Sequence, residues 1–421
     1  MKIKIERYAE HVKDYDIIVA GGGVAGVAAA VSAKRMGKNV LLIEKTIGLG
    51  GLATTGLIDL FVPMCNGRGI QIIKGMAEEL LRLSIKYGYD TIPEPWKNGE
   101  PGGGEKTRYI TRFSAPIFTL SLTELLEKEG VDILFDTIIV QPVMEDKVCK
   151  GLVVENKSGC SYYGAKMVVD TTGDADVLVG AGVPTVDGKN YHTYLTKGAD
   201  IESCKDVVES GNISKLSSYK YNGGTASLYG KGQPEGKPPR VGISAKEVNE
   251  YVIENHLECI ENLKKSDRMK RTIVSLPSMP QFRETRRIDG EYALKETDTY
   301  RHFEDSVGAI CDFERRDYLF EVPYRTMIRK EFPNLITAGR SAAAEGYAWD
   351  VLRVIPPAII TGQAAGVACA MAIDDNKTIA DVDIKKLQSE LEKENVMIHF
   401  DDSLIPSEEQ EDSSGHIEGH F

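Results

Sequence analysis

Three glycines near the N-terminus have the spacing that binding of dinucleotide phosphates requires. Gly21, Gly23 and Gly26 follow the pattern G-x-G-x-x-G. The first glycine permits a tight turn, the second admits a pyrophosphate against bare backbone, and the third lets a helix pack closely on a strand. Val24 and Ala25 lie at the expected start of that helix, whose unpaired N–H groups and positive dipole end face the phosphates. These five residues are candidate cofactor-binding residues.

A carboxylate after the next apolar run indicates the kind of dinucleotide. Glu44 lies about 20 residues beyond the glycines, the usual position of the ribose-binding acid. A carboxylate there accepts hydrogen bonds from an adenosine ribose and repels a 2′-phosphate, which favours FAD or NAD over NADP. Gly50 and Gly51 then open a second stretch of bare backbone, along which a long ligand can lie.

Two strands and a helix must position these residues. Residues 16–20 form an apolar, β-branched run typical of a strand buried on both faces, and residues 40–43 form a second one. Residues 24–36 are alanine-rich and are followed by Gly37, a helix-ending residue. The pattern predicts a βαβ unit and hence an α/β fold with a mostly parallel sheet. A further helix is expected from Pro356 to about Ala372.

Several longer motifs resemble the FAD-dependent oxidoreductase family of the glutathione-reductase-type flavoproteins. The resemblance runs from GGGVAGVAAA through GGLATTGL and continues with GVDILFDTIIVQP, AKMVVDTTGDADV, PQFRETRRIDGEYAL and FEVPYRTMIRKEFPNLITAGR, covering most of residues 14–375. GVDILFDTIIVQP (residues 130–142) and AKMVVDTTGDADV (residues 165–177) also each have the pattern of a strand. The family's order of motifs implies FAD as the cofactor. It also implies the following cofactor contacts: Glu44, Lys45, Gly50, Gly51, Leu52, Ala53, Ile139, Thr172, Gly173, Asp174, Gly339 and Arg340.

The predicted C-terminal helix adds two cofactor contacts. In flavoproteins of this shape, the positive end of such a helix points at the N1/O2 edge of the isoalloxazine and stabilises the anionic reduced flavin. Pro357 and Ala358, in its first turn, are therefore candidate cofactor-binding residues. Gly362 and Gly366 are also expected to allow close packing of this helix on the sheet.

The motif positions predict a discontinuous domain order. Residues 14–178 and 318–375 form a Rossmann-like FAD-binding domain with a mostly parallel sheet, and residues 179–317 form an inserted α+β cap or substrate domain. Residues 376–421 form a C-terminal extension. Its end, Pro406–Phe421, is acidic and poor in core-forming residues, so we expect it to be disordered or peripheral.

Candidate catalytic residues rest mainly on the family resemblance. It favours Arg283 and Arg286 as groups that anchor an anionic substrate or polarise a carbonyl. The alternative is an arginine network that braces a domain interface through Glu284 and Asp289. Tyr324 is a candidate hydrogen-bond donor in the active site, with ordinary packing as the alternative.

The histidines give no firm catalytic base and no metal site. The seven histidines lack a ligand spacing such as His-x-x-x-His, so no metal is expected. His192 and His302 lie in or beside the predicted cap and are candidate acid–base groups. A surface or structural role is the commoner one for such residues.

Composition limits the classes of binding partner and the cellular compartment that we expect for this protein. The 421 residues carry 51 basic and 63 acidic side chains, a net charge of −12, without a basic block, so neither a nucleic-acid nor an anionic-membrane partner is expected. The seven cysteines show no Cys-x-x-Cys spacing, which indicates reduced thiols and a cytoplasmic protein. Residues 17–33 and 354–373 are apolar, but their many small residues favour packing over a membrane span.

These observations predict an FAD-dependent oxidoreductase. It is expected to pass a hydride between flavin N5 and a small organic substrate, which the arginines allow to be anionic. Two alternatives stay open: an NAD-dependent dehydrogenase, and a non-catalytic flavin-binding sensor or assembly subunit. The sequence leaves the substrate, the electron donor or acceptor and the oligomeric state undetermined.

Overall fold

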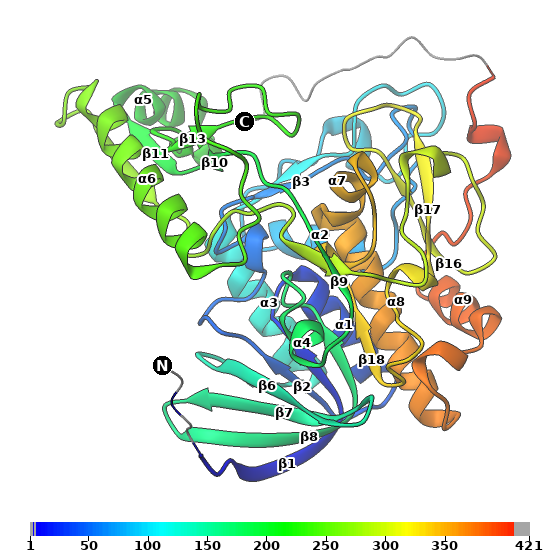
Figure 1. Cartoon of the computed structure of the whole chain (residues 1–421). Helices are drawn as coiled ribbons and strands as arrows, with labels where there is room; N and C mark the ends of the chain where they lie inside the picture. The colour runs from blue at the N-terminus through cyan, green and yellow to red at the C-terminus, as the bar shows by residue number, and fades with distance from the viewer. Residues whose placement is uncertain (1–2, 4–5, 408–421) are drawn as a thin grey trace.

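A seven-stranded, mostly parallel sheet is the main layer of the computed structural model, which describes residue 3 and residues 6–407 (Figure 1). The predicted disordered end of the chain therefore lies almost wholly outside the described residues. The sheet order is β5-β2-β1-β8-β7-β6, and β18 also pairs with β8. Its strands are β1 (Glu10–Ala20), β2 (Val40–Ile43), β5 (Asp132–Leu134), β6 (Ile138–Glu145), β7 (Val148–Asn156), β8 (Gly159–Asp170) and β18 (Leu335–Thr337).

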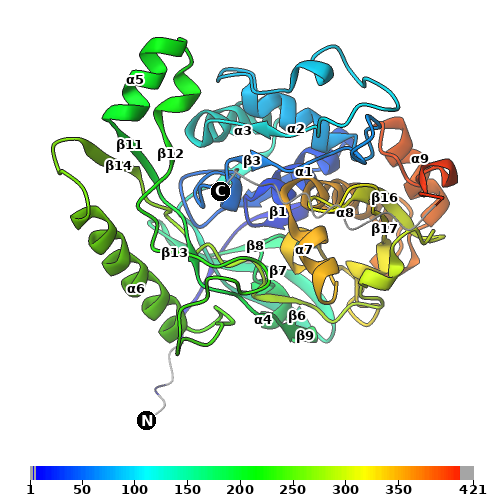
Figure 2. The ribbon, with the colours of Figure 1, turned by 90° about the horizontal axis from the view of Figure 1, so that it is seen from above.

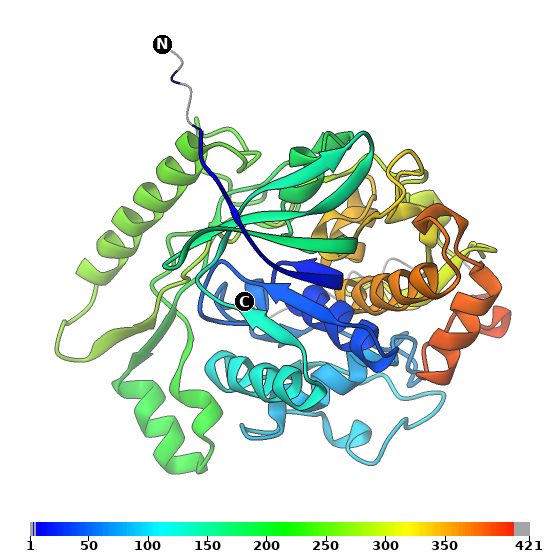
Figure 3. The same cartoon turned by 90° about the horizontal axis from the view of Figure 1, so that it is seen from below.

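The predicted βαβ unit forms the centre of this sheet. Helix α1 (Val24–Arg35) connects β1 to β2, and the two strands pair in parallel with Ile17 opposite Val40. The last residues of β1 are fully buried, as expected for a strand covered on both faces. Figure 3 shows the sheet from below, with β1 in dark blue. The α/β fold predicted from the sequence is confirmed.

One predicted strand is in fact two. The segment from Gly130 to Pro142 was expected to be a single strand, but β5 ends at Leu134 and β6 begins at Ile138. Asp136 has a φ of 49°, in the left-handed region, which lets the chain turn between them. Strand β5 therefore extends the parallel part of the sheet, whereas β6 pairs antiparallel with β7 at the other edge.

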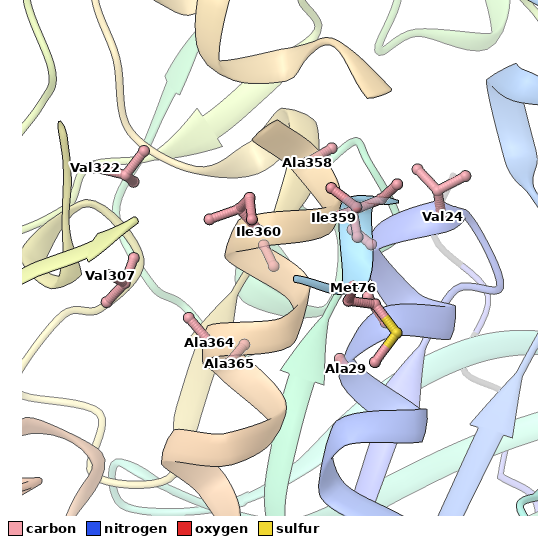
Figure 4. Close-up of a cluster of buried hydrophobic side chains, with 14 of the residues drawn as sticks. Val24, Ala29, Met76, Val307, Val322, Ala358, Ile359, Ile360, Ala364 and Ala365 are labelled. Atoms are coloured by element: carbon pink, nitrogen blue, oxygen red, sulfur yellow. The ribbon is translucent and has the colours of Figure 1, made fainter. Parts of the chain in front are cut away.

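Helix α8 (Ile355–Asp374) lies against α1. A Cβ atom on Gly362 would lie 2.2 Å from the carbonyl oxygen of Ala25, and one on Gly366 would lie 2.2 Å from that of Ala29. These glycines were expected to allow helix–sheet packing; they allow the backbones of two helices to approach instead. Figure 4 shows the side chains of α8 between α1 and two buried valines, Val307 and Val322.

The same helix has the length and mean hydropathy of a membrane span. However, 94% of its most apolar 18-residue stretch is buried inside the molecule, as in the core helix of a globular protein. Around it lie α2 (Met76–Ile85), α9 (Ile384–Lys393) and the antiparallel hairpin of β16 (Ser306–Cys311) and β17 (Leu319–Pro323). Helix α3 (Ala115–Glu129) packs against α1 and α2. Strand β16 was assigned to the inserted cap, yet its side chains belong to this main core.

A separate lobe lies beside this body (Figures 1 and 2). It contains β10 (Thr193–Tyr194), β11 (Lys197–Asp200), α5 (Ile201–Ser210), β12 (Ser218–Tyr219), β13 (Gly224–Thr225), α6 (Ala245–Lys264) and β14 (Arg271–Ser275). Its own small core consists of Tyr194, Tyr251, Cys259 and Phe282. The pair of β9 (Thr185–Asp187) and β15 (Arg286–Ile288) joins it to the body. We propose this lobe as the inserted domain.

A buried ion pair ties the lobe to the body. Lys197 Nζ lies 2.7 Å from Asp59 Oδ2, and both side chains are almost fully buried. The Tyr219 hydroxyl donates a hydrogen bond of 2.7 Å to the other oxygen of Asp59. Burial lowers the pKa of Lys197, and Asp59 opposes that change. The lobe is thus held against the loop that precedes β3 (Leu60–Phe61).

Candidate active site

A cavity of about 310 Å³ runs along the carboxyl ends of the parallel strands. This is the edge at which α/β sheets bind their ligands. The cavity is bounded by the N-termini of α1 and α8, the Gly50–Gly51 turn and the start of β6. It brings together most of the predicted cofactor contacts: Gly21, Gly23, Val24, Ala25, Glu44, Lys45, Gly50, Gly51, Leu52, Ala53, Ile139, Thr172, Gly173, Gly339, Arg340 and Ala358.

The three motif glycines occupy three different environments. Gly21 has a φ of 107°, and a Cβ there would lie 2.5 Å from the Thr171 carbonyl oxygen. A Cβ on Gly26 would lie 1.9 Å from the Gly21 carbonyl oxygen, so this glycine serves close helix–strand packing, as expected. A Cβ on Gly23 would meet no protein atom within 4 Å. Gly23 therefore opens onto the cavity, where a pyrophosphate can approach the backbone, and the residues fit a dinucleotide.

Glu44 is held in place by the glycine loop. Its Oε2 accepts a hydrogen bond of 2.8 Å from the Gly22 N–H, and its Oε1 accepts two bonds of 2.8 Å from Thr46. The carboxylate is almost fully buried and lines the cavity. A carboxylate oxygen can accept more than one hydrogen bond, so Glu44 can also accept from a ribose hydroxyl.

The N-terminus of α8 forms the opposite wall of the cavity. Ile355 and Ala358 line it, whereas Pro357 is buried within the first turn and does not. Arg340 also lines it, and its guanidinium donates to the Phe282 carbonyl oxygen at 2.9 Å and to Asp174 Oδ1 at 3.1 Å. Asp174 itself, a predicted contact, pairs with Arg340 and does not line the cavity.

None of the three predicted catalytic residues, Arg283, Arg286 and Tyr324, lines the cavity. Tyr324 is buried, and its hydroxyl donates a hydrogen bond of 2.7 Å to the Ile379 carbonyl oxygen. Arg286 donates to the Asp174 carbonyl oxygen at 2.9 Å and to Asp176 Oδ1 at 2.7 Å. Tyr324 thus packs in the core, and Arg286 braces the start of helix α4 (Asp176–Gly180). The partners of Arg286 differ from Glu284 and Asp289, which the sequence suggested.

Arg283 belongs to a buried cluster of four charged side chains beside the cavity. Its Nη2 donates to Thr193 Oγ1 at 3.1 Å, but its buried Nη1 has no hydrogen-bond partner among the described residues. The other members are Glu284 and, from α7 (Tyr347–Arg353), Asp350 and Arg353. Arg353 lines the cavity and bonds Asp350 Oδ1 from Nε at 2.9 Å, while its Nε lies 3.9 Å from Glu284 Oε1.

The cluster changes the acidity of its members. Burial raises the pKa of Glu284 to about 8; the nearby charge of Asp350 adds to this increase and Arg353 opposes it. Burial likewise lowers the pKa of Arg283 to about 10, and the positive charge of Arg353 adds to that decrease. The buried Oε1 of Glu284 accepts no hydrogen bond from the part of the chain that the structure describes. The cluster therefore holds one donor, Arg283 Nη1, and one acceptor, Glu284 Oε1, that make no hydrogen bond with the described residues, although Oε1 is in an ion pair with Arg353.

Sequence reasoning missed several residues of the cavity wall. They are Ile43, Thr46, Thr55, Thr137, Ile138, Thr171, Asp176, Met279, Ala338, Arg353 and Ile355. Most of them adjoin predicted contacts in the sequence, so the same motifs could have indicated them. Arg353 had a weaker signal, a charge just before the apolar helix start at Pro356. Met279 comes from the segment after β14, and no local pattern places it near the cavity.

The candidate histidines lie apart from this wall. His192 is buried in the lobe, where its backbone N–H bonds Gln233 and burial lowers the pKa of its ring. His302 lies near β17 at the far side of the main core. Neither lines the cavity, so the structure gives neither of them an acid–base role there.

Comparison with curated proteins finds relatives that each match part of this chain. Among curated proteins, a thioredoxin reductase of Ureaplasma parvum is 35% identical over 80 residues, covering 19% of this chain and 26% of that protein. A digeranylgeranylglycerophospholipid reductase 1 of Methanococcoides burtonii is 25% identical over 229 residues, covering 50% and 48%. The tRNA uridine 5-carboxymethylaminomethyl modification enzyme MnmG of Lactiplantibacillus plantarum is 29% identical over 197 residues, covering 45% and 29%. The chain thus matches between a quarter and a half of the length of these relatives.

A solved structure resembles the chain over most of its length. The geranylgeranyl bacteriochlorophyll reductase-like protein of Thermoplasma acidophilum is 15% identical, with a TM-score of 0.44, over 90% of this chain and 83% of that one. The model of the family described as FAD dependent oxidoreductase matches residues 16–214 and 243–391. This match identifies FAD rather than NAD as the cofactor and an enzyme rather than a sensor. The chain belongs to the FAD dependent oxidoreductase family, and it is a flavoprotein enzyme.

Proposed function

We propose that the enzyme oxidises a small organic acid that carries a hydroxyl or amino group next to its carboxylate. The observation that carries this proposal is the pair of free buried groups beside the cavity, Arg283 Nη1 and Glu284 Oε1. Buried polar groups are nearly always paired in folded proteins, so two such groups next to a cofactor cavity indicate a ligand. Reduction of the corresponding oxo or imino acid, the reverse reaction, would use the same two side chains.

The two groups differ in what they can bind. Arg283 can only donate, so its free N–H is suited to an anionic or carbonyl oxygen of the substrate. Glu284 can accept, so its free oxygen is suited to the O–H or N–H of the carbon that is oxidised. When bound, FAD supplies a flavin that takes up a hydride at N5. The substrate then loses one hydride from carbon and one proton from oxygen or nitrogen.

Glu284 is the proposed acceptor of that proton. A carboxyl group whose pKa is about 8 can release or take up a proton near neutral pH, which suits general acid–base catalysis. Arg353 and Asp350 hold the group in place: Arg353 bonds Asp350 and lies 3.9 Å from Glu284. Because the cluster is buried, it also keeps water from the reacting atoms.

Anaerobic reduction of the bound flavin tests the proposal. The purified protein is mixed with a panel of 2-hydroxy acids, 2-amino acids, and neutral alcohols and amines, and flavin absorbance near roughly 450 nm is followed. We expect bleaching by acids of one of the first two groups. Glu284→Gln should slow flavin reduction by about 10²–10⁴-fold. Arg283→Lys should mainly raise the substrate concentration that gives half of the maximal reduction rate.

Arg325→Lys is the matched control, since Arg325 pairs with Asp305 on the surface. Its reduction rate should equal that of the unmodified protein. Bleaching only by neutral substrates, or an unchanged rate in Glu284→Gln, would contradict the assignment of these two residues. A protein that binds FAD but is reduced by none of the panel would favour a different substrate class. A cytoplasmic location is part of the same proposal, supported by seven cysteines that are all unpaired.

A further inference from the structure

Three side chains distant in sequence meet on the far side of the main core, at the C-terminal segment. They are His302, in the loop before β16, Glu321, in β17, and His399, in the segment after α9. One possible ligand atom from each lies within 4.8 Å of those from the other two. This site lies outside the cofactor cavity, and the proposed function does not use it.

The buried carboxylate is the centre of the group. The side chain of Glu321 has no solvent exposure. Its Oε1 lies 2.5 Å from Nδ1 of His302, and both of its oxygens lie 3.0 Å from Nδ1 of His399. Its Oε2 also accepts a hydrogen bond of 2.8 Å from the Phe303 N–H. Two imidazole nitrogens therefore converge on a carboxylate that is already oriented by the backbone.

The outer contacts match those of a metal-bound histidine. Nε2 of His302 lies 2.8 Å from Asp402 Oδ1, and its ring lies against that of Phe400, with centroids 4.5 Å apart. A metal-ligating histidine usually donates its second N–H to a carboxylate, which orients the ring. The side chains of both histidines are 41% exposed, so an ion can enter and a water can complete its coordination.

Backbone contacts hold the third ligand in place. The Ala309 N–H donates to the Met397 carbonyl oxygen at 2.6 Å, and Ser306 Oγ donates to that of Ile398 at 2.7 Å. The C-terminal segment therefore runs beside β16 and presents His399 to the hairpin. A metal ion bound by all three side chains would tie this segment to the hairpin.

We propose that His302, Glu321 and His399 bind a divalent transition-metal ion, with Asp402 as the carboxylate that orients His302. Two imidazoles and one carboxylate form a ligand set that suits Zn²⁺. At Zn–ligand distances of about 2.0–2.2 Å, tetrahedral ligands lie roughly 3.4 Å apart. Small movements of the two partly exposed rings bring the present atoms to that spacing. The role of the ion is to secure the C-terminal segment.

Zinc binding to the full-length, FAD-loaded protein tests the proposal. The protein is treated with EDTA, freed of the chelator and titrated with Zn²⁺ by calorimetry, while Co²⁺ is used to report coordination by visible absorption. We expect one saturable site, a tetrahedral or five-coordinate Co²⁺ spectrum, and a higher Tm with Zn²⁺. The double variant His302→Gln/His399→Gln should lose all three signals, and Asp402→Asn should weaken binding by about 10–100-fold.

His416→Gln/His420→Gln is the matched control, because it removes the same number of histidines from the end of the chain, outside the described residues. It should bind Zn²⁺ with unchanged affinity. The variants change partly exposed rings rather than buried Glu321, and their unaltered Tm without metal would show that they fold. Lack of a saturable site in the unmodified protein, or equal binding in His302→Gln/His399→Gln, would leave only a hydrogen-bonded pair of imidazoles and overturn the proposal.

Discussion

Gly23→Val separates binding of the cofactor from folding of the protein. The backbone of Gly23 has φ −65° and ψ 175°, which any residue adopts, and its Cβ position is open. A valine side chain therefore meets no protein atom as it leaves the backbone, and it extends into the space proposed for the pyrophosphate. The change should expel FAD and leave the fold intact.

The size of the effect follows from the contacts that are lost. A hydrogen bond from a backbone N–H to a charged phosphate contributes about 1.5–3 kcal/mol. Loss of even one such bond weakens FAD binding by roughly 10- to 150-fold. The helix itself should lose at most about 1 kcal/mol, because glycine is a better N-cap residue than valine.

Two measurements check this prediction. The dissociation constant of FAD is measured by flavin fluorescence during titration of the apoprotein, and the free energy of unfolding of the apoprotein is measured with urea. Gly103→Val is the control, since Gly103 is exposed and its Cβ position is also open. Unchanged FAD affinity in Gly23→Val would refute the placement of the phosphates against Gly23. A loss of several kcal/mol in apoprotein stability would refute the statement that the cavity, and not the fold, is affected.

Three further predictions concern the charged groups and the core. Glu284 keeps its proton in the folded state up to about pH 8 but loses it near pH 4.5 when unfolded, so this residue lowers the free energy of unfolding as pH rises between those values. The Tm of the unmodified protein, measured against that of Glu284→Gln, should therefore fall from pH 5.5 to pH 8.5, by the equivalent of up to about 3 kcal/mol. Lys197→Met removes the nearer of the two cations beside buried Asp59 and leaves Arg112 Nη1 at 4.0 Å from it, so it should destabilise the protein by up to about 3–5 kcal/mol in urea unfolding, whereas Lys197→Met with Asp59→Leu should recover much of the loss. Gly362→Ala places a methyl group 2.2 Å from the Ala25 carbonyl oxygen and should lower the free energy of unfolding by about 1–3 kcal/mol.

Each of these predictions has a contrary result. If the stabilities of the protein and of Glu284→Gln change in parallel with pH, the pKa of Glu284 is not raised by folding. If Lys197→Met is as stable as the unmodified protein, the ion pair does not hold the lobe to the body. If Gly362→Ala matches Gly103→Ala in stability, the backbones of α1 and α8 are farther apart than the structure has them.

Local backbone requirements were readable from residue types. The helix and the second strand of the βαβ unit were predicted with nearly their observed bounds, because β-branched runs, alanine-rich segments and glycines each restrict the backbone within a few residues. The first strand was predicted only for residues 16–20, whereas β1 begins at Glu10, because its first residues are exposed and lack the apolar pattern. The same local patterns predicted the part of the cavity wall that is formed by Gly21, Gly23 and Gly50. The long motifs of the family extended this reasoning to Ile139, Gly339 and Arg340.

Contacts between distant segments were decided by the tertiary structure. Asp174 has the sequence context of a cofactor contact, yet it pairs with Arg340, which comes from a segment 166 positions later in the chain. Tyr324 lies in a family motif, but core packing turns its hydroxyl to Ile379. The single strand expected from Gly130 to Pro142 was divided by Asp136, whose left-handed backbone carries little signal in the sequence.

The sequence by itself thus determined the cofactor, the type of fold and the glycine cradle, because these depend on the spacing of a few residues along one stretch of chain. The tertiary structure alone decided which charges meet. Glu284 and Asp350 come together beside the cavity, and His302, Glu321 and His399 meet across the core, although no spacing in the sequence relates them. The physical reason is that a pair of charges distant in sequence is brought together by the packing of the elements that carry it, and this packing depends on the whole core.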